Sequence, residues 1–198
     1  MRRFLLCMLA LGAASFGAEK GFRPLFDGKT LNGWDGDPRL WKVQDGVIVG
    51  STEGVTLNGN SFLISKQSYR DFILKLDVKL RNHNSGVQFR SEALPNWVVA
   101  GYQADMAEDN YWGSIYEERG KRGILANGWE KARTVLKPHD WNEYEILCQG
   151  DHLQVKLNGV VTADIHDSAR SEGIIALQLH RGPAMEAYFR NIRIKVLK

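Results

Sequence analysis

The sequence predicts an all-β fold, an antiparallel β-sandwich. Many short segments alternate apolar and polar residues with a period of two, and turn sequences rich in Gly, Asn and Asp separate them. Almost no segment has helical periodicity. With 198 residues, 43% of them hydrophobic and 25% charged, the chain has the length and composition of one globular domain with a single core.

The individual strands follow from the same alternation. In DFILKLDVKL, the apolar residues of one face are Phe72, Leu74, Leu76, Val78 and Leu80. HLQVKLNGVVTADIH contains two alternating runs joined by Asn158-Gly159, which predicts a hairpin with a type I′ turn. Residues 118–142 predict a long irregular loop with one helical turn near Trp129. Further strands are expected at 46–50, 62–65, 86–91, 98–106, 112–117, 143–149, 174–179 and 186–197.

The N-terminus predicts a secretory signal peptide. Arg2 and Arg3 precede the apolar run FLLCMLALGAA, small residues follow it, and the run is short for a bilayer span. We therefore expect a signal at 1–17, a domain at 18–198, a secreted or periplasmic location and no membrane anchor after cleavage. Cys148 is then the one cysteine of the mature chain, and we expect it to be a buried, unreactive thiol.

The charge of the chain is nearly balanced. The formal net charge is +3, and it falls to +1 once Arg2 and Arg3 are removed with the signal. Nucleic acids and anionic membranes attract strongly basic surfaces. The composition therefore indicates neither of them as a partner.

Three predicted strands carry polar side chains of a particular kind opposite their apolar face. These are Gln88 and Arg90 in SGVQFRSE, Gln103 and Asp105 in GYQADMA, and Gln178 and His180 in IALQLH. Amides and a guanidinium group can bind several hydroxyls at once, whereas Lys, Glu and Thr are typical of sheet faces that are simply exposed to solvent. Aromatic residues that can stack on a sugar ring lie near in sequence: Trp97, Tyr102, Tyr111, Trp112, Tyr116 and Trp129. Together they predict a carbohydrate groove.

The chain resembles the 3-keto-disaccharide hydrolase domain family, formerly DUF1080, from about Gly21 to the C-terminus. The matching segments occur in the same order: FRPLFDGKTLNGW, WKVQDGVIVG, DFILKLDVKLRNHNSGVQFRSE, GYQADM with YWGSIYEERG, WNEYEILCQGDHLQVKLNGV and IALQLHRGPAMEAYFRNIRIKVL. The resemblance implies a concanavalin-like jelly roll with the ligand on its concave face. It also implies export, and action on glycosides whose C3 hydroxyl has been oxidised to a ketone.

Such a substrate has a distinctive chemistry. The C3 ketone acidifies the C2 proton, so a base can remove it, and the resulting enolate can expel the group at C1; later addition of water gives net hydrolysis. This route needs one general base and one group that stabilises the enolate oxygen. Conventional glycosidases need two carboxyls instead, and the E-x-D-x-x-E pattern of jelly-roll glucanases is absent from the sequence.

Three residues are the candidate catalytic groups. His180 is the first candidate base because imidazole titrates near neutral pH, with a metal ligand as its alternative role. Asp105 is the second candidate base. Arg90 would place a positive charge near the enolate; its alternative is an ion pair with Asp105 or Glu92.

The candidate substrate-binding residues are Gln88, Gln103, Gln178, Tyr116, Glu117 and Trp112. Gln178 has the alternative role of holding the tautomer of His180. Glu117 and Glu118 alternate faces, so at most one of them enters the groove. For Tyr116 and Trp112 the alternative is a place in the core.

No cofactor is assigned, and a divalent metal ion stays an open alternative. Its ligands would be His180, Asp105, Glu117 and His83, although the sequence shows no H-x-H or H-E-x-x-H spacing. Two competing functions also stay open: a non-catalytic secreted carbohydrate-binding module, and a glycosidase that acts on unoxidised sugars.

Overall fold

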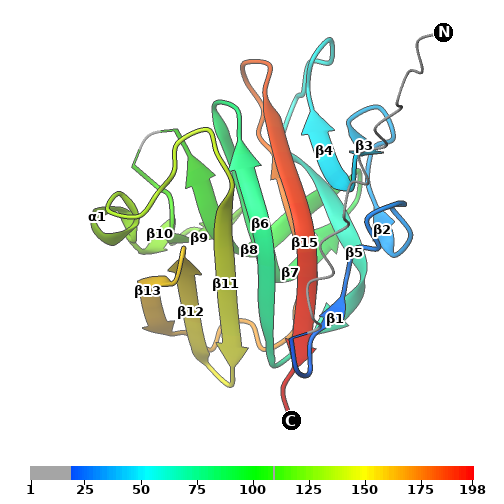
Figure 1. Cartoon of the computed structure of the whole chain (residues 1–198). Helices are drawn as coiled ribbons and strands as arrows, with labels where there is room; N and C mark the ends of the chain where they lie inside the picture. The colour runs from blue at the N-terminus through cyan, green and yellow to red at the C-terminus, as the bar shows by residue number, and fades with distance from the viewer. Residues whose placement is uncertain (1–18, 109) are drawn as a thin grey trace, which may run out of the picture.

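Two antiparallel β-sheets pack face to face in the structure, a computed structural model that describes residues 19–108 and 110–198 (Figure 1). Within these residues one sheet has eight strands and the other has seven. The predicted antiparallel sandwich is confirmed. The predicted signal peptide at 1–17 lies outside the described residues.

The eight-stranded sheet has the order β13-β12-β11-β6-β15-β4-β3, with β1 paired to β15. Its strands are β1 (Arg23–Pro24), β3 (Trp41–Gln44), β4 (Val47–Ser51), β6 (Phe72–Leu80), β11 (Asn142–Gln149), β12 (His152–Leu157), β13 (Val160–His166) and β15 (Glu186–Val196).

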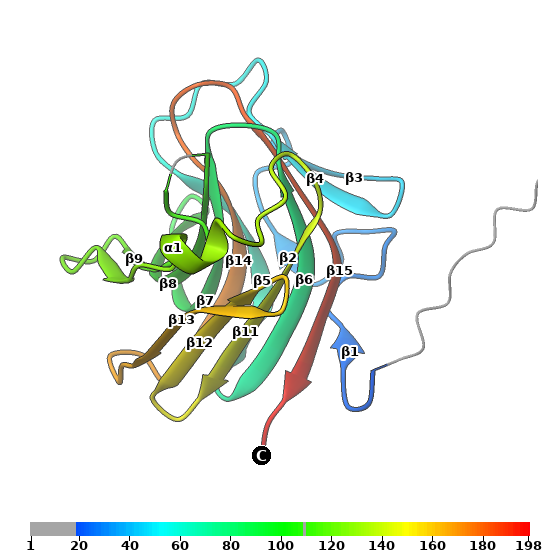
Figure 2. The same ribbon diagram turned by 60° about the vertical axis from the view of Figure 1, so that its left-hand side comes forward.

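The seven-stranded sheet has the order β10-β9-β8-β7-β14-β5-β2 and lies behind the first in Figure 1; Figure 2 shows the two layers from the side. Its strands are β2 (Trp34–Asp35), β5 (Ser61–Tyr69), β7 (Asn84–Leu94), β8 (Val98–Ala107), β9 (Ile115–Glu118), β10 (Ile124–Ala126) and β14 (Gly173–Leu179).

The core lies between the sheets and follows the alternation of the sequence. The alternating apolar residues of β6, from Phe72 to Leu80, are almost completely buried, and Ile175, Leu177 and Leu179 of β14 meet them from the other sheet. Each strand turns its alternate residues outward, because successive side chains of a strand point to opposite faces. The outward residues of β14 include Gln178, so the lining predicted for this strand is on the outer face of the seven-stranded sheet.

Most predicted elements are present, and the differences have a physical reason. Asn158 and Gly159 have φ angles of 48° and 83°, which confirms the predicted turn type. The helical turn near Trp129 is also confirmed, as α1 (Trp129–Ala132). β1, β2, β3 and β10 were not predicted, because strands of two to four residues are too short to display a period.

Cys148 lies in the core, as predicted. Burial raises the pKa of its thiol to about 12, so the thiolate is not formed near neutral pH. Across residues 19–108 and 110–198, no helix is both long enough and apolar enough to span a bilayer.

Candidate active site

A pocket of about 280 Å³ lies on the outer face of the seven-stranded sheet. We call it the Asp105 pocket. It is lined by Asn60, Asn84, Gln103, Asp105, Tyr111, Tyr116, Glu118, Ile124, Gln178 and His180. Five strands, β7, β8, β9, β10 and β14, and the residue before β5 contribute to it.

A glycine opens the floor of this pocket. Asp105 of β8 pairs with Gly86 of β7, and the register of β14, which sets Leu177 against Val87, brings Gln178 next to Gly86 on the other side. A Cβ atom at Gly86 would lie 2.4 Å from Cδ of Gln103, closer than real contacts allow. The missing side chain therefore lets the Gln103 amide lie across β7 between the two neighbouring strands.

Gln103 connects the polar groups of the floor. Its Nε2 atom donates to Oδ1 of Asp105 (3.2 Å) and to Oε1 of Gln178 (3.4 Å). Its Oε1 atom accepts a hydrogen bond of 2.7 Å from Gln88, a fully buried residue behind the pocket. With both ends of its amide held, Gln103 has a fixed orientation.

Asp105 is a nearly buried carboxyl group with one oxygen available. Its Oδ1 accepts from Gln103 and from the backbone N–H of Met106 (3.1 Å), whereas Oδ2 accepts no hydrogen bond from the described residues. The side chain is 5% exposed, and this burial raises the pKa of Asp105 to about 7. Near neutral pH the group is therefore divided between its acid and its carboxylate.

A second buried carboxyl group, Glu118, is held from both sides. Asn60 donates to Oε1 and Gln178 donates to Oε2, each at 3.2 Å. Burial raises the pKa of Glu118 above its usual value, although these two bonds act in the opposite direction. Both of its oxygens are engaged, so Glu118 fixes the amides of Asn60 and Gln178.

His180 follows β14 and contacts a second histidine. Its Nδ1 atom lies 2.6 Å from the carbonyl oxygen of Arg181 and 3.2 Å from Nε2 of His83. A carbonyl oxygen only accepts, so we assign the ring proton to Nδ1, which leaves the lone pair on Nε2. Burial lowers the pKa of His180, and the imidazole is therefore neutral at pH 7 and able to take up a proton.

The structure brings five of the predicted site residues together at the pocket. They are Gln103, Asp105, Tyr116, Gln178 and His180. Gln88 supports them from behind through its bond to Gln103 and does not line the pocket.

Arg90 does not lie at the pocket, and its predicted position near the enolate is wrong. A β-bulge between Phe89 and Glu92 interrupts the alternation of β7, and Arg90 has a φ of 45°. Its fully buried guanidinium group bonds the carbonyls of Arg70 (2.7 Å) and Gly150 (2.6 Å) and pairs with Asp71 at 2.7 Å. The alternative partners, Asp105 and Glu92, were also wrong.

Trp112 and Glu117 are also corrections. Trp112 is 5% exposed and packs in the core against Tyr144, with 6.0 Å between ring centroids. Glu117 points away from the pocket, where it forms an ion pair with Arg122 at 2.6 Å. Glu118 occupies the pocket instead, because it shares a strand face with Tyr116.

Several lining residues were not predicted. The alternation of β9 could have found Glu118, since Tyr116 was already placed in the groove. Asn60 precedes a strand, so no periodicity marks it. Tyr111, which lies in a loop, was already among the aromatic residues expected near the groove. Asn84 begins β7 in the sequence NHNSG, which reads first as a turn.

The four proposed metal ligands do not form one cluster, although Asp105 and His180 line the same pocket and His83 contacts His180. Glu117 is held by Arg122, and the part of the chain that the structure describes contains no group of three or more His, Cys, Asp or Glu arranged to hold a metal ion. We therefore assign no metal to the Asp105 pocket.

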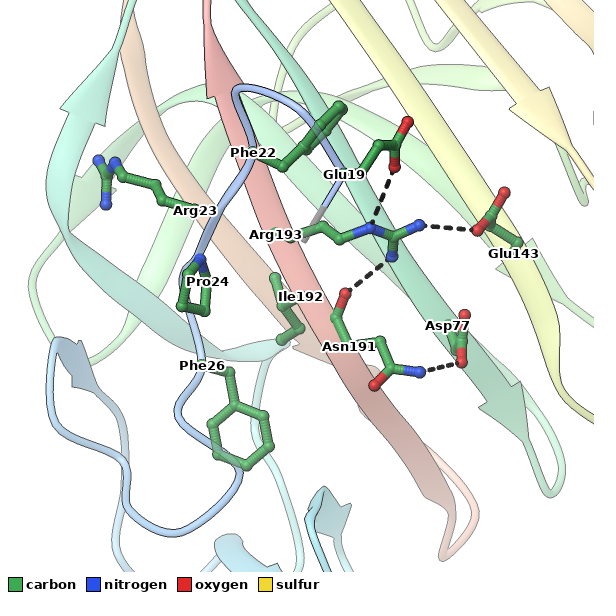
Figure 3. Close-up of a pocket in the computed structure, with 10 residues that line it drawn as sticks. All are labelled: Glu19, Phe22, Arg23, Pro24, Phe26, Asp77, Glu143, Asn191, Ile192 and Arg193. Atoms are coloured by element: carbon green, nitrogen blue, oxygen red, sulfur yellow. Dashed lines mark hydrogen bonds and ion pairs between the residues drawn. The ribbon is translucent and has the colours of Figure 1, made fainter. Parts of the chain in front are cut away.

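A second cavity, of about 400 Å³, lies on the outer face of the eight-stranded sheet, beneath the segment that leads into β1 (Figure 3). We call it the Arg193 cavity. Arg193 pairs there with Glu143 (3.0 Å) and Glu19 (3.6 Å), and Asn191 donates to Asp77 (2.6 Å). These groups already pair with one another, so few of them are left to bind a ligand.

Comparison with known proteins places the chain in a family. The model of the 3-keto-alpha-glucoside-1,2-lyase-like domain matches residues 21–195. The chain belongs to this family of 3-keto-glucoside lyases and hydrolases. A 3-keto-disaccharide hydrolase of Bacteroides thetaiotaomicron is 24% identical over an alignment of 231 residues, which covers 89% of this chain and 79% of that protein.

Solved structures share the fold of this 3-keto-glucoside lyase-like domain. A crystal structure described as a candidate glycosyl hydrolase from Parabacteroides distasonis has a TM-score of 0.67 at 23% identity, covering 90% of this chain and 94% of that one. The carbohydrate-binding module CBM66 of Bacillus subtilis has a TM-score of 0.64 at 21% identity, covering 81% and 94%. A B. subtilis protein with a galectin-like fold is also similar, with a TM-score of 0.66 at 12% identity, covering 88% of this chain and 94% of that one.

Proposed function

We propose that the protein is an exported enzyme that cleaves 3-keto-α-glucosides through removal of the C2 proton. One observation carries the mechanism: the Asp105 pocket holds two groups whose pKa values are shifted in opposite directions. His180 is a neutral base, because its pKa is lowered, and Asp105 keeps a proton up to about pH 7. Such a divergent pair is a mark of acid and base roles within one site.

In this mechanism Nε2 of His180 takes the proton from C2. The electrons of that C–H bond form the C2=C3 bond, and the former ketone oxygen becomes an enolate that accepts the proton of Asp105. The enol then collapses: its O–H proton returns to the Asp105 carboxylate, the C3 carbonyl forms again and the C1–C2 double bond forms. The C1–O bond breaks with its electrons on the leaving oxygen, which takes the proton that His180 removed from C2, so both side chains return to their starting states. Water can add to the unsaturated ketone at C1, which gives net hydrolysis.

The protonated Asp105 stabilises the enolate oxygen, the role predicted for Arg90. A neutral acid in a buried site can donate a strong hydrogen bond to a developing oxyanion. Gln103 keeps Asp105 in place through Oδ1, so Oδ2 is the oxygen left to meet the substrate. Tyr116 and the amide of Gln178 line the same pocket and are suited to the ring and its hydroxyls.

A glycosidase on unoxidised sugars is the second candidate, and one observation favours it. Asp105 and Glu118 are two carboxyl groups with raised pKa values in one pocket. Both oxygens of Glu118 are already engaged by amides, which leaves this group less suited to attack or proton transfer.

The test is to incubate the mature protein with maltose, with methyl α-glucoside and with the 3-keto derivative of each. The proposal expects cleavage of the keto sugars alone, and loss of that cleavage in His180→Gln and Asp105→Asn. Cleavage of unoxidised maltose at a comparable rate would contradict it in favour of the glycosidase. Binding of keto sugars without any product would favour the carbohydrate-binding module.

A further inference from the structure

A second apolar cluster lies on the same outer sheet face as the Asp105 pocket. It consists of Phe62, Ile64, Val99, Ile174 and Ala176, with Trp97 packed against it. Phe62 is paired directly with Gln178, so it shares the outer face with this pocket residue, and Ile64 is paired with Ala176 farther along the same strands. This apolar area continues the floor of the pocket along β5 and β14.

The turn between β7 and β8 folds over this apolar area. The backbone N–H of Phe62 donates to the carbonyl of Trp97 at 2.9 Å, which fastens the turn to β5. Asn96 and Trp97 have φ angles of 61° and 54°. A left-handed conformation is rare for a residue as bulky as Trp, and local strain of this kind gathers at binding sites.

A cavity of about 540 Å³ lies beside the indole. We call it the Trp97 cavity. It is lined by Asp35, Ile64, Ser65, Lys66, Ala93, Leu94, Pro95, Asn96, Trp97 and Ile174. Its volume lies in the range of sites that bind small ligands.

Four polar groups around the Trp97 cavity are available, unlike those of the Arg193 cavity, whereas the Ser65 hydroxyl is engaged by the backbone of Gln67 and Ile175. The side chains of Asp35, Lys66 and Asn96 and the indole N–H of Trp97 make no hydrogen bond or ion pair with residues 19–108 or 110–198. A half-buried aromatic surface edged by a carboxylate, an ammonium and an amide is suited to a sugar ring. The ring's C–H face can lie on the indole while its hydroxyls meet the polar groups.

We propose that the Trp97 cavity is a subsite for a distal sugar ring of an extended 3-keto-oligosaccharide. Ile174 of the Trp97 cavity and Gln178 of the Asp105 pocket are four residues apart on β14. This corresponds to at most about 13 Å, because the strand pairing is irregular between Ile174 and Ala176. A ligand that reaches both sites must be longer than one ring. The inference rests on the proposed function, since it assigns a substrate length to that same site.

The test compares Trp97→Ala with Trp141→Ala, which removes a half-buried indole from the outer face of the other sheet. The substrates are the 3-keto derivatives of methyl α-glucoside, maltotriose and an aryl α-glucoside. We expect Trp97→Ala to raise KM for the maltotriose derivative about tenfold, as for the loss of one aromatic contact, and to leave the methyl glucoside unchanged. Trp97→Phe is expected to recover part of the affinity. Trp141→Ala is expected to leave KM unchanged for both substrates.

Equal losses with the methyl glucoside and the maltotriose derivative would overturn the subsite, because they would show a general effect on folding. A larger loss with the aryl glucoside than with the trisaccharide would overturn the sugar assignment in favour of an aromatic group. Calorimetric binding of unoxidised maltotriose separates the two proposals. If no substrate is cleaved but maltotriose binds the wild type more tightly than Trp97→Ala, the subsite is supported and the proposed catalytic function is contradicted. If maltotriose binds both proteins equally, the subsite is contradicted.

Discussion

Nε2 of His83 lies 3.2 Å from Nδ1 of His180, with the two rings edge to face and their centroids 5.0 Å apart. Both nitrogens also face the carbonyl oxygen of Arg181. Burial is the larger cause of the lowered pKa of His180, and the nearby His83 lowers this pKa further. His83 is thus a positioning residue: it holds the ring that we propose takes the C2 proton.

We expect His83→Asn to move the acid limb of the pH–rate profile to higher pH. Asn tolerates the left-handed backbone of His83, whose φ is 71°, so the turn itself should persist. Without the neighbouring ring, the pKa of His180 rises and the base is protonated, and inactive, over a wider acidic range. Titration of the His180 ring signals by NMR gives the same pKa independently of catalysis. An unchanged acid limb would separate His83 from the reaction.

The pH–rate profile of the wild-type enzyme should be narrow and bell-shaped. Activity rises as His180 loses its proton, below the usual imidazole pKa, and falls as Asp105 loses its proton near pH 7. The measurement is kcat/KM for a 3-keto-glucoside between pH 4.5 and 9. If activity instead rises through pH 7 and stays high, Asp105 is the base and the two roles are exchanged.

Asp105→Asn should stabilise the protein above pH 7. The folded state keeps the Asp105 proton up to about pH 7, whereas the unfolded chain releases it near 3.8, so the folded state binds more protons between these values. The free energy of unfolding of the wild type therefore falls as the pH rises through this window, by up to about 4 kcal/mol. Asn does not titrate. Chemical denaturation at pH 4 and pH 8 should show the variant's advantage only at pH 8, and an equal difference at both would contradict a raised pKa.

Gly86→Ala should disable the site while the fold persists. The new Cβ would displace the Gln103 amide, with loss of its bonds to Asp105 and Gln178, and a shift of about 1 Å in such a site costs on the order of 100-fold in rate. The stability cost is about 1–3 kcal/mol. Gly59→Ala is the matched control, because a Cβ there meets nothing within 4 Å. Full activity in Gly86→Ala would show that the Gln103 bridge is dispensable.

The sequence located the part of the site that regular strands build. Gln103, Asp105, Gln178 and His180 could be found because a period of two places them on one face of β8 and of β14 with its continuation, the two strands that flank β7. Asn60 could not, since it reaches the site from a loop through tertiary contacts. His83 was predicted only as a candidate metal ligand, and its contact with His180 comes from a turn that no strand periodicity places. Glu117 was predicted in the groove together with Tyr116, but neighbouring residues of a strand point to opposite faces. Glu118, which shares a face with Tyr116, lines the pocket instead.

Arg90 shows how a single irregularity defeats the same reasoning. Strict alternation would place it beside Gln88, but the bulge in β7 turns its side chain toward Asp71 and the carbonyls at the far ends of the strands. A β-bulge has no reliable mark in one sequence, and SGVQFRSE reads as a regular strand. The buried guanidinium is therefore a structural group.

Arg90→Leu should destabilise the protein by about 3 kcal/mol and leave the kcat of the folded fraction close to that of the wild type. The substitution leaves Asp71 without its buried partner and removes donors from the carbonyls of Arg70 and Gly150. Arg133→Leu, which breaks an exposed pair with Glu130, should change stability by less than about 0.5 kcal/mol. Unfolding in urea gives the stability, and active-site titration corrects kcat for the folded fraction. A variant as stable as the wild type but inactive on 3-keto-glucosides would return Arg90 to the reaction, because only a group that acts on the substrate could be lost in that way.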